Sequence, residues 1–313
     1  MILGVALGGR APVAVAVRDG AFAGPADPRA ARAARAACVA VDLEPAGAAP
    51  VAVIRVGGPC PPVLGPLAGW PGGSGVATIV RGGHSLTGRP LAPLDTDAVR
   101  RFAAGCGLTD FAVTATGSPV LADHELAVAA VVSAEVPGAR ITLSYEFGRP
   151  GLREREGDAI RNAALGQAAG RLADEVAARL PGVPLYFARS GSGLVSEHYF
   201  RRYPLACLRG AAASHARGLA ALGEAAGVPG PVAAAYGATL AVPEAQVERI
   251  VQARGRAELD RVLQDVRDEV LTRVVSAGAA PGSAAIAETT VNPLSYLPDG
   301  LYRVLVTARG AAP

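Results

Sequence analysis

Ionisable side chains are densest between residues 146 and 162, where four acids and four arginines fall within 17 residues and Asn162 ends the group. The group follows an apolar run at 140–144 that is typical of a strand, and it leads into a helix through the turn at 148–151. Open α/β sheets bind their ligands at such strand ends, in the crevice outside the carboxyl edge. The solvated first turn of a helix would carry the same charges, because acids there complement the helix dipole. Both interpretations stay open from the spacing alone.

Five side chains in this group are candidates for contact with a ligand. Glu146 is the candidate proton-transfer group, and Glu154 is a second carboxylate suited to a general base or a metal ligand. Arg149, Arg155 and Asn162 supply donors that would bind a small anion or an amide. The arginines would also hold the two carboxylates as ion pairs, which is the simpler interpretation.

A second candidate loop follows the apolar run at 185–188 and reads Arg189-Ser190-Gly191-Ser192-Gly193. A Gly-rich turn at a strand end binds an anion through its N–H groups, and Arg189 adds a positive charge. Ser190 and Ser192 are the further candidate ligand-binding residues of this loop. An ordinary turn before a helix explains the same residues equally well. The loop lacks the Gly-x-Ser-x-Gly spacing, so it gives little support to serine catalysis.

Composition excludes several classes of function. The chain contains no lysine, which rules out a P-loop and a lysine nucleophile. Its 30 arginines are spread among 27 acids and only 4% of residues are aromatic, a pattern that argues against nucleic-acid binding. Four dispersed cysteines and four dispersed histidines show no metal-ligand spacing, so we expect no metal and free thiols. We see no signal peptide and no membrane span, and we therefore expect a cytoplasmic protein.

Periodicity predicts the elements that must position these loops. Alternating valines predict a hairpin of strands at 2–7 and 13–17 that leads into 21–23. We expect further strands at 51–56, 111–114, 140–144, 185–188, 284–290 and 301–307, and helices at 28–38, 97–104, 124–133, 154–180 and 256–276, with 57–87 irregular. The strands at 140–144 and 185–188 flank the long helix, so a parallel arrangement would bring both candidate loops to one sheet edge.

Several segments resemble, in order, the hydantoinase/oxoprolinase family (A-subunit type) of the actin-like ATPase superfamily. They read Ser144-Tyr145-Glu146, Gly148-Arg149-Pro150-Gly151-Leu152, Glu154-Arg155-Glu156 and Asn162-Ala163, with flanking stretches at 82–95, 118–132, 185–218 and 277–306. The resemblance implies an α/β fold with an actin-like (ribonuclease H-like) core, and ATP-dependent opening of cyclic amides in A/B subunit pairs. It also makes His215 the best single histidine for a catalytic role, because the family has a substrate-domain turn there. Tyr145 replaces a family histidine, which weakens any acid–base role at that position.

The first phosphate loop departs from the family pattern Gly-x-Asp-x-Gly-Gly-Thr-x-Thr-Asp. Residues 4–13 read GVALGGRAPV, so Gly8 and Gly9 remain. Ala6 replaces the first aspartate of the pattern and Val13 replaces the last one. Arg10 and Pro12 replace the two threonines. Ala, Pro and Val cannot hold Mg²⁺ or phosphate through their side chains. We therefore interpret Gly8, Gly9 and Arg10 as a degenerate phosphate loop and expect no cofactor. Residues 231–243 are either a ruined second phosphate loop or the helix that follows a deleted domain.

Together these observations predict an actin-like unit at 1–180 and a shortened second half at 181–313. We expect a hydantoinase/oxoprolinase-like pseudoenzyme that has lost ATP binding and acts as a small-molecule-binding or scaffold subunit. The alternative is an ATP-independent hydrolase or cyclase that acts on a small cyclic amide or carboxylate in a biosynthetic pathway. The expected partners are an amide or carboxylate ligand and either a second copy or a hydantoinase B-like subunit. Both candidate loops and His215 should meet in one crevice.

Overall fold

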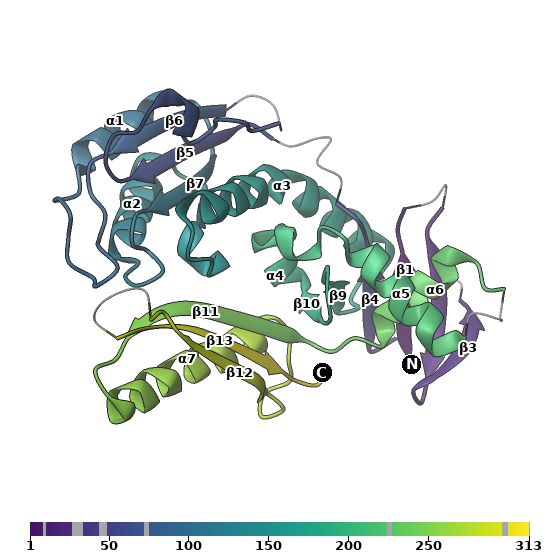
Figure 1. Cartoon of the computed structure of the whole chain (residues 1–313). Helices are drawn as coiled ribbons and strands as arrows, with labels where there is room; N and C mark the ends of the chain where they lie inside the picture. The colour runs from purple at the N-terminus through teal and green to yellow at the C-terminus, as the bar shows by residue number, and fades with distance from the viewer. Residues whose placement is uncertain are drawn as a thin grey trace.

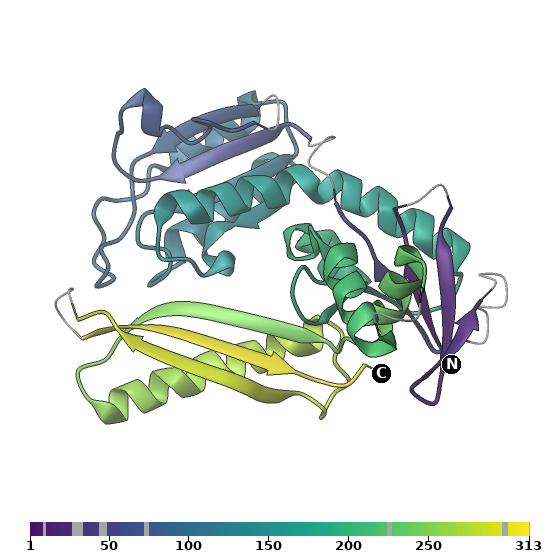
Figure 2. The ribbon, with the colours of Figure 1, turned by 45° about the vertical axis from the view of Figure 1, so that its right-hand side comes forward.

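The computed structural model describes residues 1–8, 11–26, 34–43, 49–71, 75–223, 227–295 and 300–312. These residues form three sheets, and the long helix α3 (Leu152–Arg179) runs from one sheet to the next (Figures 1 and 2). No helix in this described part is long and apolar enough to cross a membrane.

The first sheet contains six strands in the order β10-β9-β4-β1-β2-β3. They are β1 (Ile2–Ala6), β2 (Val13–Arg18), β3 (Ala21–Pro25), β4 (Ala36–Ala40), β9 (Leu185–Ala188) and β10 (Leu194–Ser196). β1 is antiparallel to β2 and parallel to β4, which in turn is parallel to β9. Asp19 and Gly20 connect β2 to β3 with φ of 51° and 80°, the conformation that a two-residue hairpin turn needs. The predicted N-terminal hairpin is confirmed.

Helices cover both faces of this sheet. The second half of α3 packs on one face, and α6 (Gly230–Thr239) packs on the other, beside α5 (Gly210–Leu222). Small residues allow a close approach: a Cβ on Gly4 would lie 2.0 Å from the carbonyl oxygen of Ala235. Any larger residue at position 4 would push α6 off the sheet.

The second sheet is parallel, and the chain forms it between β4 and β9. Its order is β6-β5-β7-β8, with β5 (Val51–Val56), β6 (Gly75–Val80), β7 (Asp110–Ala115) and β8 (Arg140–Leu143). α1 (Thr96–Gly105) and α2 (Asp123–Glu135) pack on one face, and the first half of α3 packs on the other. Because both faces are covered, β5 and β7 are buried along their whole length.

A third, antiparallel sheet lies at the C-terminal end in the order β11-β13-β12. Its strands are β11 (Glu244–Gln252), β12 (Ala285–Pro293) and β13 (Leu301–Arg309), and α7 (Arg256–Ser276) covers one face. The short helices η2 (Pro62–Leu64), η3 (Ser144–Phe147), α4 (Glu197–Arg202) and η4 (Pro204–Cys207) complete the described elements. Figure 1 shows β11 extending below the parallel sheet and α4.

Two sequence predictions were wrong. The helix predicted at 28–38 lies partly outside the described residues, and its last residues, 36–38, begin β4. β4 reads Ala-Ala-Cys-Val-Ala, and its small residues are buried between helices on both faces, so tertiary packing overrides their helix propensity. The irregular segment predicted at 57–87 contains β6, which pairs with β5 in parallel.

The other predicted strands and helices are confirmed within a few residues. Residues 230–239 form α6, which favours the helix interpretation of 231–243 over a ruined phosphate loop. The deletion of a neighbouring domain stays a prediction, as does the division at residue 180. The six-stranded sheet takes β9 and β10 from beyond residue 180, so both halves of the chain build it.

Candidate functional site

The carboxyl ends of three parallel strands meet at one edge of the six-stranded sheet. β1 ends at Ala6, which pairs with Val13 across the hairpin, and Leu7 donates to the carbonyl of Ala40 at 2.9 Å. Gly8 has a φ of 143°. Gly9 and Arg10, the rest of the degenerate phosphate loop, lie outside the described residues. Among the described residues of this hairpin end no carboxylate or hydroxyl is present to hold a metal–phosphate.

Helix α5 begins at the same edge, and its first N–H groups are occupied by the protein itself. Oδ1 of Asp42, two residues after β4, accepts from the N–H groups of Ala211 at 2.9 Å and Ala212 at 3.3 Å. A Cβ on Gly210 would come within 2.2 Å of the Ala188 carbonyl oxygen, so the helix start lies directly on the strand ends. A helix N-terminus is a ready anion site, and here a carboxylate fills it. The sequence analysis missed Asp42, although an acid directly after an apolar run was the available signal.

The loop at 189–193 binds a strand of the third sheet. Arg189 forms an ion pair with Glu244 at 3.4 Å, and the Ser192 hydroxyl donates to the same carboxylate at 2.8 Å. Arg309 reaches it too, at 2.8 Å. Ser190 accepts from the Arg209 N–H at 3.0 Å. These side chains hold β11 and β13 against β9 and β10.

The charged turn after β8 is organised around two buried ionic side chains. Arg155 is 1% exposed and donates to the carbonyls of Arg149, Pro150 and Ala115 at 2.8–3.0 Å. Glu125 is fully buried and accepts from the N–H groups of Ala115 and Tyr145 and from the Ser144 hydroxyl. Burial raises the pKa of Glu125. The guanidinium of Arg155 therefore supports the turn instead of facing a ligand.

The remaining predicted residues of this turn also have partners within the protein, apart from Glu154. Arg149 pairs with Asp158 at 3.0 Å, which is the ion-pair interpretation of the cluster. Glu154 is exposed above Gly151. Asn162 is buried and donates to the Thr142 hydroxyl at 3.1 Å and to the Arg202 carbonyl at 2.9 Å. It thereby joins β8, α3 and α4.

The structure does not bring the predicted residues together in one crevice. Arg189 and Ser192 surround Glu244, and His215 lies on α5 near Gly230 at the start of α6. Glu146 faces Arg202 of α4, at 3.6 Å. The predicted β-α-β unit is wrong, because β8 belongs to the parallel sheet and β9 to the six-stranded sheet, so the two strands that flank α3 do not share one sheet edge. The catalytic roles of Glu146 and His215 stay predictions.

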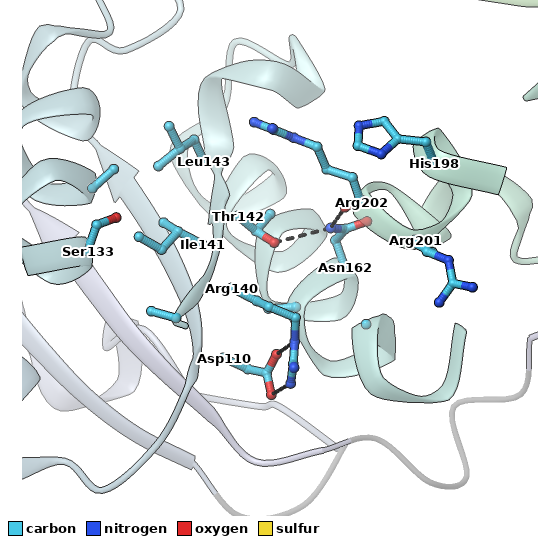
Figure 3. Close-up of a pocket in the computed structure, with 14 residues that line it drawn as sticks. Asp110, Ser133, Arg140, Ile141, Thr142, Leu143, Asn162, His198, Arg201 and Arg202 are labelled. Carbon is cyan, nitrogen blue, oxygen red and sulfur yellow. Dashed lines mark hydrogen bonds and ion pairs between the residues drawn. The ribbon is translucent and has the colours of Figure 1, made fainter. Parts of the chain in front are cut away.

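A pocket of about 450 Å³ lies between β8 and α4, with α3 at its base (Figure 3). Arg140 donates to both oxygens of Asp110 on one side, at 2.6 and 2.5 Å. His198, Arg201 and Arg202 line the opposite side. Asn162 is the only predicted ligand-binding residue among its described lining residues. Sequence reasoning missed the others because Asp110, Arg140 and Arg202 lie far apart in the chain.

The described residues contain no cluster of side chains that is typical of a metal site. No group of three or more His, Cys, Asp or Glu side chains there could hold a metal ion.

Comparisons with known proteins give the fold. No known protein family matches the sequence, and neither does any curated protein. An ATP-dependent caprolactamase from Pseudomonas jessenii matches with a TM-score of 0.56 and 15% identity, over 73% of this chain and 41% of the caprolactamase. The nucleotide-free structure of an acetone carboxylase matches with a TM-score of 0.52 and 13% identity, over 71% of this chain and 40% of that chain.

These likenesses establish a mixed α/β fold consistent with an actin-like core. The chain spans about two fifths of the length of each of these two structures. At such low identity the similarity extends to the fold alone.

Proposed function

We propose that this chain is a hydantoinase/oxoprolinase-like protein that does not use ATP and acts as a binding or scaffold subunit. Two observations support the family assignment: the ordered motifs between residues 82 and 306, and the fold shared with two proteins whose names describe ATP-dependent enzymes. Neither observation bears on nucleotide binding by this chain. The residues at the strand ends of the six-stranded sheet do.

The observation that carries the proposal is the carboxylate of Asp42 on the first N–H groups of α5. A phosphate at this helix start would meet a negative charge already hydrogen-bonded there, and would have to displace it. The hairpin beside it offers Ala6, Leu7 and Pro12, which cannot coordinate Mg²⁺ through their side chains. The described residues of this sheet edge therefore offer a triphosphate neither a metal ligand nor an open helix start.

We infer that the pocket between β8 and α4 binds a ligand. The pocket beside β8 has the size at which proteins hold small ligands, roughly 300–1,000 Å³. An amide or carboxylate ligand, a second copy or a hydantoinase B-like subunit, and a cytoplasmic location are parts of this proposal.

Phosphate release from Mg–ATP tests the proposal. We expect no turnover above background for the wild-type chain, and none for Asp42→Ala, because the Mg²⁺ ligands would still be missing. Steady phosphate release by the wild-type chain would contradict the proposal, provided that this activity co-purifies with the protein through two chromatographic steps.

A further inference from the structure

β8 is an edge strand whose outer side opens into the pocket of Figure 3. Arg140 pairs with Asp110, and its N–H donates to the Thr109 carbonyl at 2.8 Å. In a parallel pair, residues that bond the neighbour alternate with residues whose N–H and C=O point away from it. Ile141 and Leu143 therefore direct their backbone groups away from β7. Both residues line the pocket.

The two sides of this groove differ in chemistry. On the α2 side it is lined by Ala129, Ala139 and the side chains of β8 that face the apolar core. On the α4 side it is lined by His198, Arg201 and Arg202. A strand placed beside β8 would point successive side chains to these two sides in turn. Alternating apolar and acidic residues complement such a groove.

Arg202 is the cation available to an acidic ligand. Arg140 is held by Asp110, and Arg201 is held by Glu197 at 2.6 Å and Asp174 at 2.8 Å. Arg202 is 59% exposed, its Nε donates to the Tyr203 hydroxyl at 2.8 Å, and its contact with the Glu146 carboxylate is long, at 3.6 Å. A carboxylate can therefore approach the Arg202 guanidinium without breaking a short ion pair.

Size sets the length of the ligand. A four-residue strand is about 13 Å long, at roughly 3.3 Å per residue. β8 has four residues, and two of them, Ile141 and Leu143, direct their backbone N–H and C=O groups away from β7. The base of the groove is formed partly by Ala163 and Gly166, which leave room above α3.

We propose that this groove binds a short extended peptide of alternating acidic and apolar residues, which adds to β8 as a fifth strand of the parallel sheet. Backbone hydrogen bonds to Ile141 and Leu143 supply affinity, and the Arg202 guanidinium selects a carboxylate. This inference rests on the proposed binding function, because it names the class of ligand for that function.

Fluorescence anisotropy with fluorescein-labelled Val-Glu-Val-Glu amide tests the proposal on the full chain. We expect saturable binding that weakens at least tenfold when the backbone nitrogens of both glutamates are methylated, because the residues that flank a valine opposite Ile141 carry the N–H groups that face β8. Replacing both glutamates of the peptide by lysine should abolish binding.

Protein variants test the two contacts separately. Ile141→Pro removes an N–H that points away from β7, so it should abolish binding without removing a bond between β7 and β8. Ile141→Val is the matched control and should bind as wild type. Arg202→Gln should weaken binding at least tenfold, whereas Arg161→Gln, which removes an arginine of similar exposure outside the groove, should not.

Three results would overturn the proposal: no saturable binding of the peptide, equal binding of its N-methylated form, or full competition by glutarate at the peptide's own concentration. The last result would indicate a site for small carboxylates only. If Ile141→Pro does not fold, the methylated peptide tests the same hydrogen bonds on the wild-type chain. No nucleotide enters these titrations, so their failure leaves the ATP result standing.

Discussion

Glu125 joins α2 to the ends of two strands of the parallel sheet. Its carboxylate accepts from Ala115 N–H at 2.9 Å, from the Ser144 hydroxyl at 2.6 Å and from Tyr145 N–H at 3.0 Å. These donors lie at the ends of β7 and β8, while Glu125 itself lies on α2. One side chain therefore fixes three elements around the charged turn.

Glu125→Gln should destabilise the protein by about 1–3 kcal/mol, because an amide replaces one acceptor oxygen by a donor and leaves a buried N–H without a partner. Urea unfolding measures this change. Glu135→Gln is the matched control on the same helix, since Glu135 only pairs with the half-exposed Arg100, and its effect should stay within about 1 kcal/mol. Equal effects of the two substitutions would contradict the role given to Glu125.

His124 gives the protein a predicted pH dependence. Its Nδ1 accepts from Gly83 N–H at 2.8 Å, and its ring lies 4.2 Å from that of the buried His84. Burial lowers the pKa of His124 and His84 lowers it further, while Asp123 acts in the opposite direction. The unfolded chain therefore takes up the proton first as the pH falls, and stability is lost from about pH 6.5 downwards through the folded pKa.

Unfolding free energies at pH 7.5 and pH 5.5 measure this loss. His124→Asn keeps an acceptor near the position of Nδ1 but does not titrate, so its stability should fall less between the two pH values. Glu125 contributes with the opposite sign, because burial raises its pKa, and the comparison with His124→Asn removes that contribution. An identical pH dependence in both proteins would rule out His124 as the source.

Residue identity alone indicated where charges gather but not what they contact. Arg155 and Arg149 are neighbours in the sequence, yet Arg155 is buried under Ala115 from 40 residues earlier, and Arg149 stays on the surface with Asp158. The distinction depends on which strand end folds over the turn. Periodicity within the turn carries no information about that contact.

At the scale of elements, Asp42 and α5 form the feature on which the functional proposal depends. The Asp42 carboxylate caps α5 although Asp42 lies 169 residues before Ala211 in the sequence. Its role resembles that of an N-cap, which satisfies N–H groups and complements the helix dipole.

Asp42→Ala should therefore lower the free energy of unfolding by about 1 kcal/mol, within the range of roughly 0.5–2 kcal/mol for lost caps. Asp42→Asn should cost less, because its carbonyl oxygen still accepts from the same N–H groups. Chemical denaturation of the two variants beside wild type checks the order. An asparagine variant less stable than the alanine variant would contradict the capping geometry.

Elements with strong periodicity were predictable, and elements built from small residues were not. The valine stripe of α7 comes from burial on one face, and in β2 valines on the α6 side alternate with alanines on the other side, so both leave a regular pattern. β4 is covered on both faces by tightly packed helices, so alanine fills it and the pattern disappears. The pocket beside β8 could not be predicted from the sequence for a related reason. Its walls come from α2, α3 and α4, which meet only in the folded chain.

At the scale of the whole molecule, β11 connects the C-terminal sheet to the other two sheets, the six-stranded sheet and the parallel sheet, between which α3 runs. Glu244 at its start receives Arg189, Ser192 and Arg309, and Arg249 further along donates to the Tyr145 carbonyl at 3.1 Å. In the arrangement of the three sheets in Figure 2, β11 thus contacts both other sheets, and the Ser196 N–H adds a hydrogen bond to the Ala277 carbonyl after α7, at 2.7 Å.

Glu244→Ala should destabilise the protein by about 1–3 kcal/mol, since it leaves Arg189, which is only 21% exposed, without its carboxylate and also removes the weaker pair with the exposed Arg309. Limited proteolysis should show faster release of the C-terminal sheet, starting near residue 243. Glu288→Ala on the exposed strand β12 is the control and should change neither quantity. Unchanged proteolysis of Glu244→Ala would show that β11 is held by other contacts.

Isothermal titration calorimetry of Mg–ATP into the full chain tests directly whether the protein binds the nucleotide. We expect no saturable heat, because Asp42 occupies the first N–H groups of α5 and the described end of the hairpin offers no metal ligand. One-to-one binding with micromolar affinity that disappears without Mg²⁺ would contradict it.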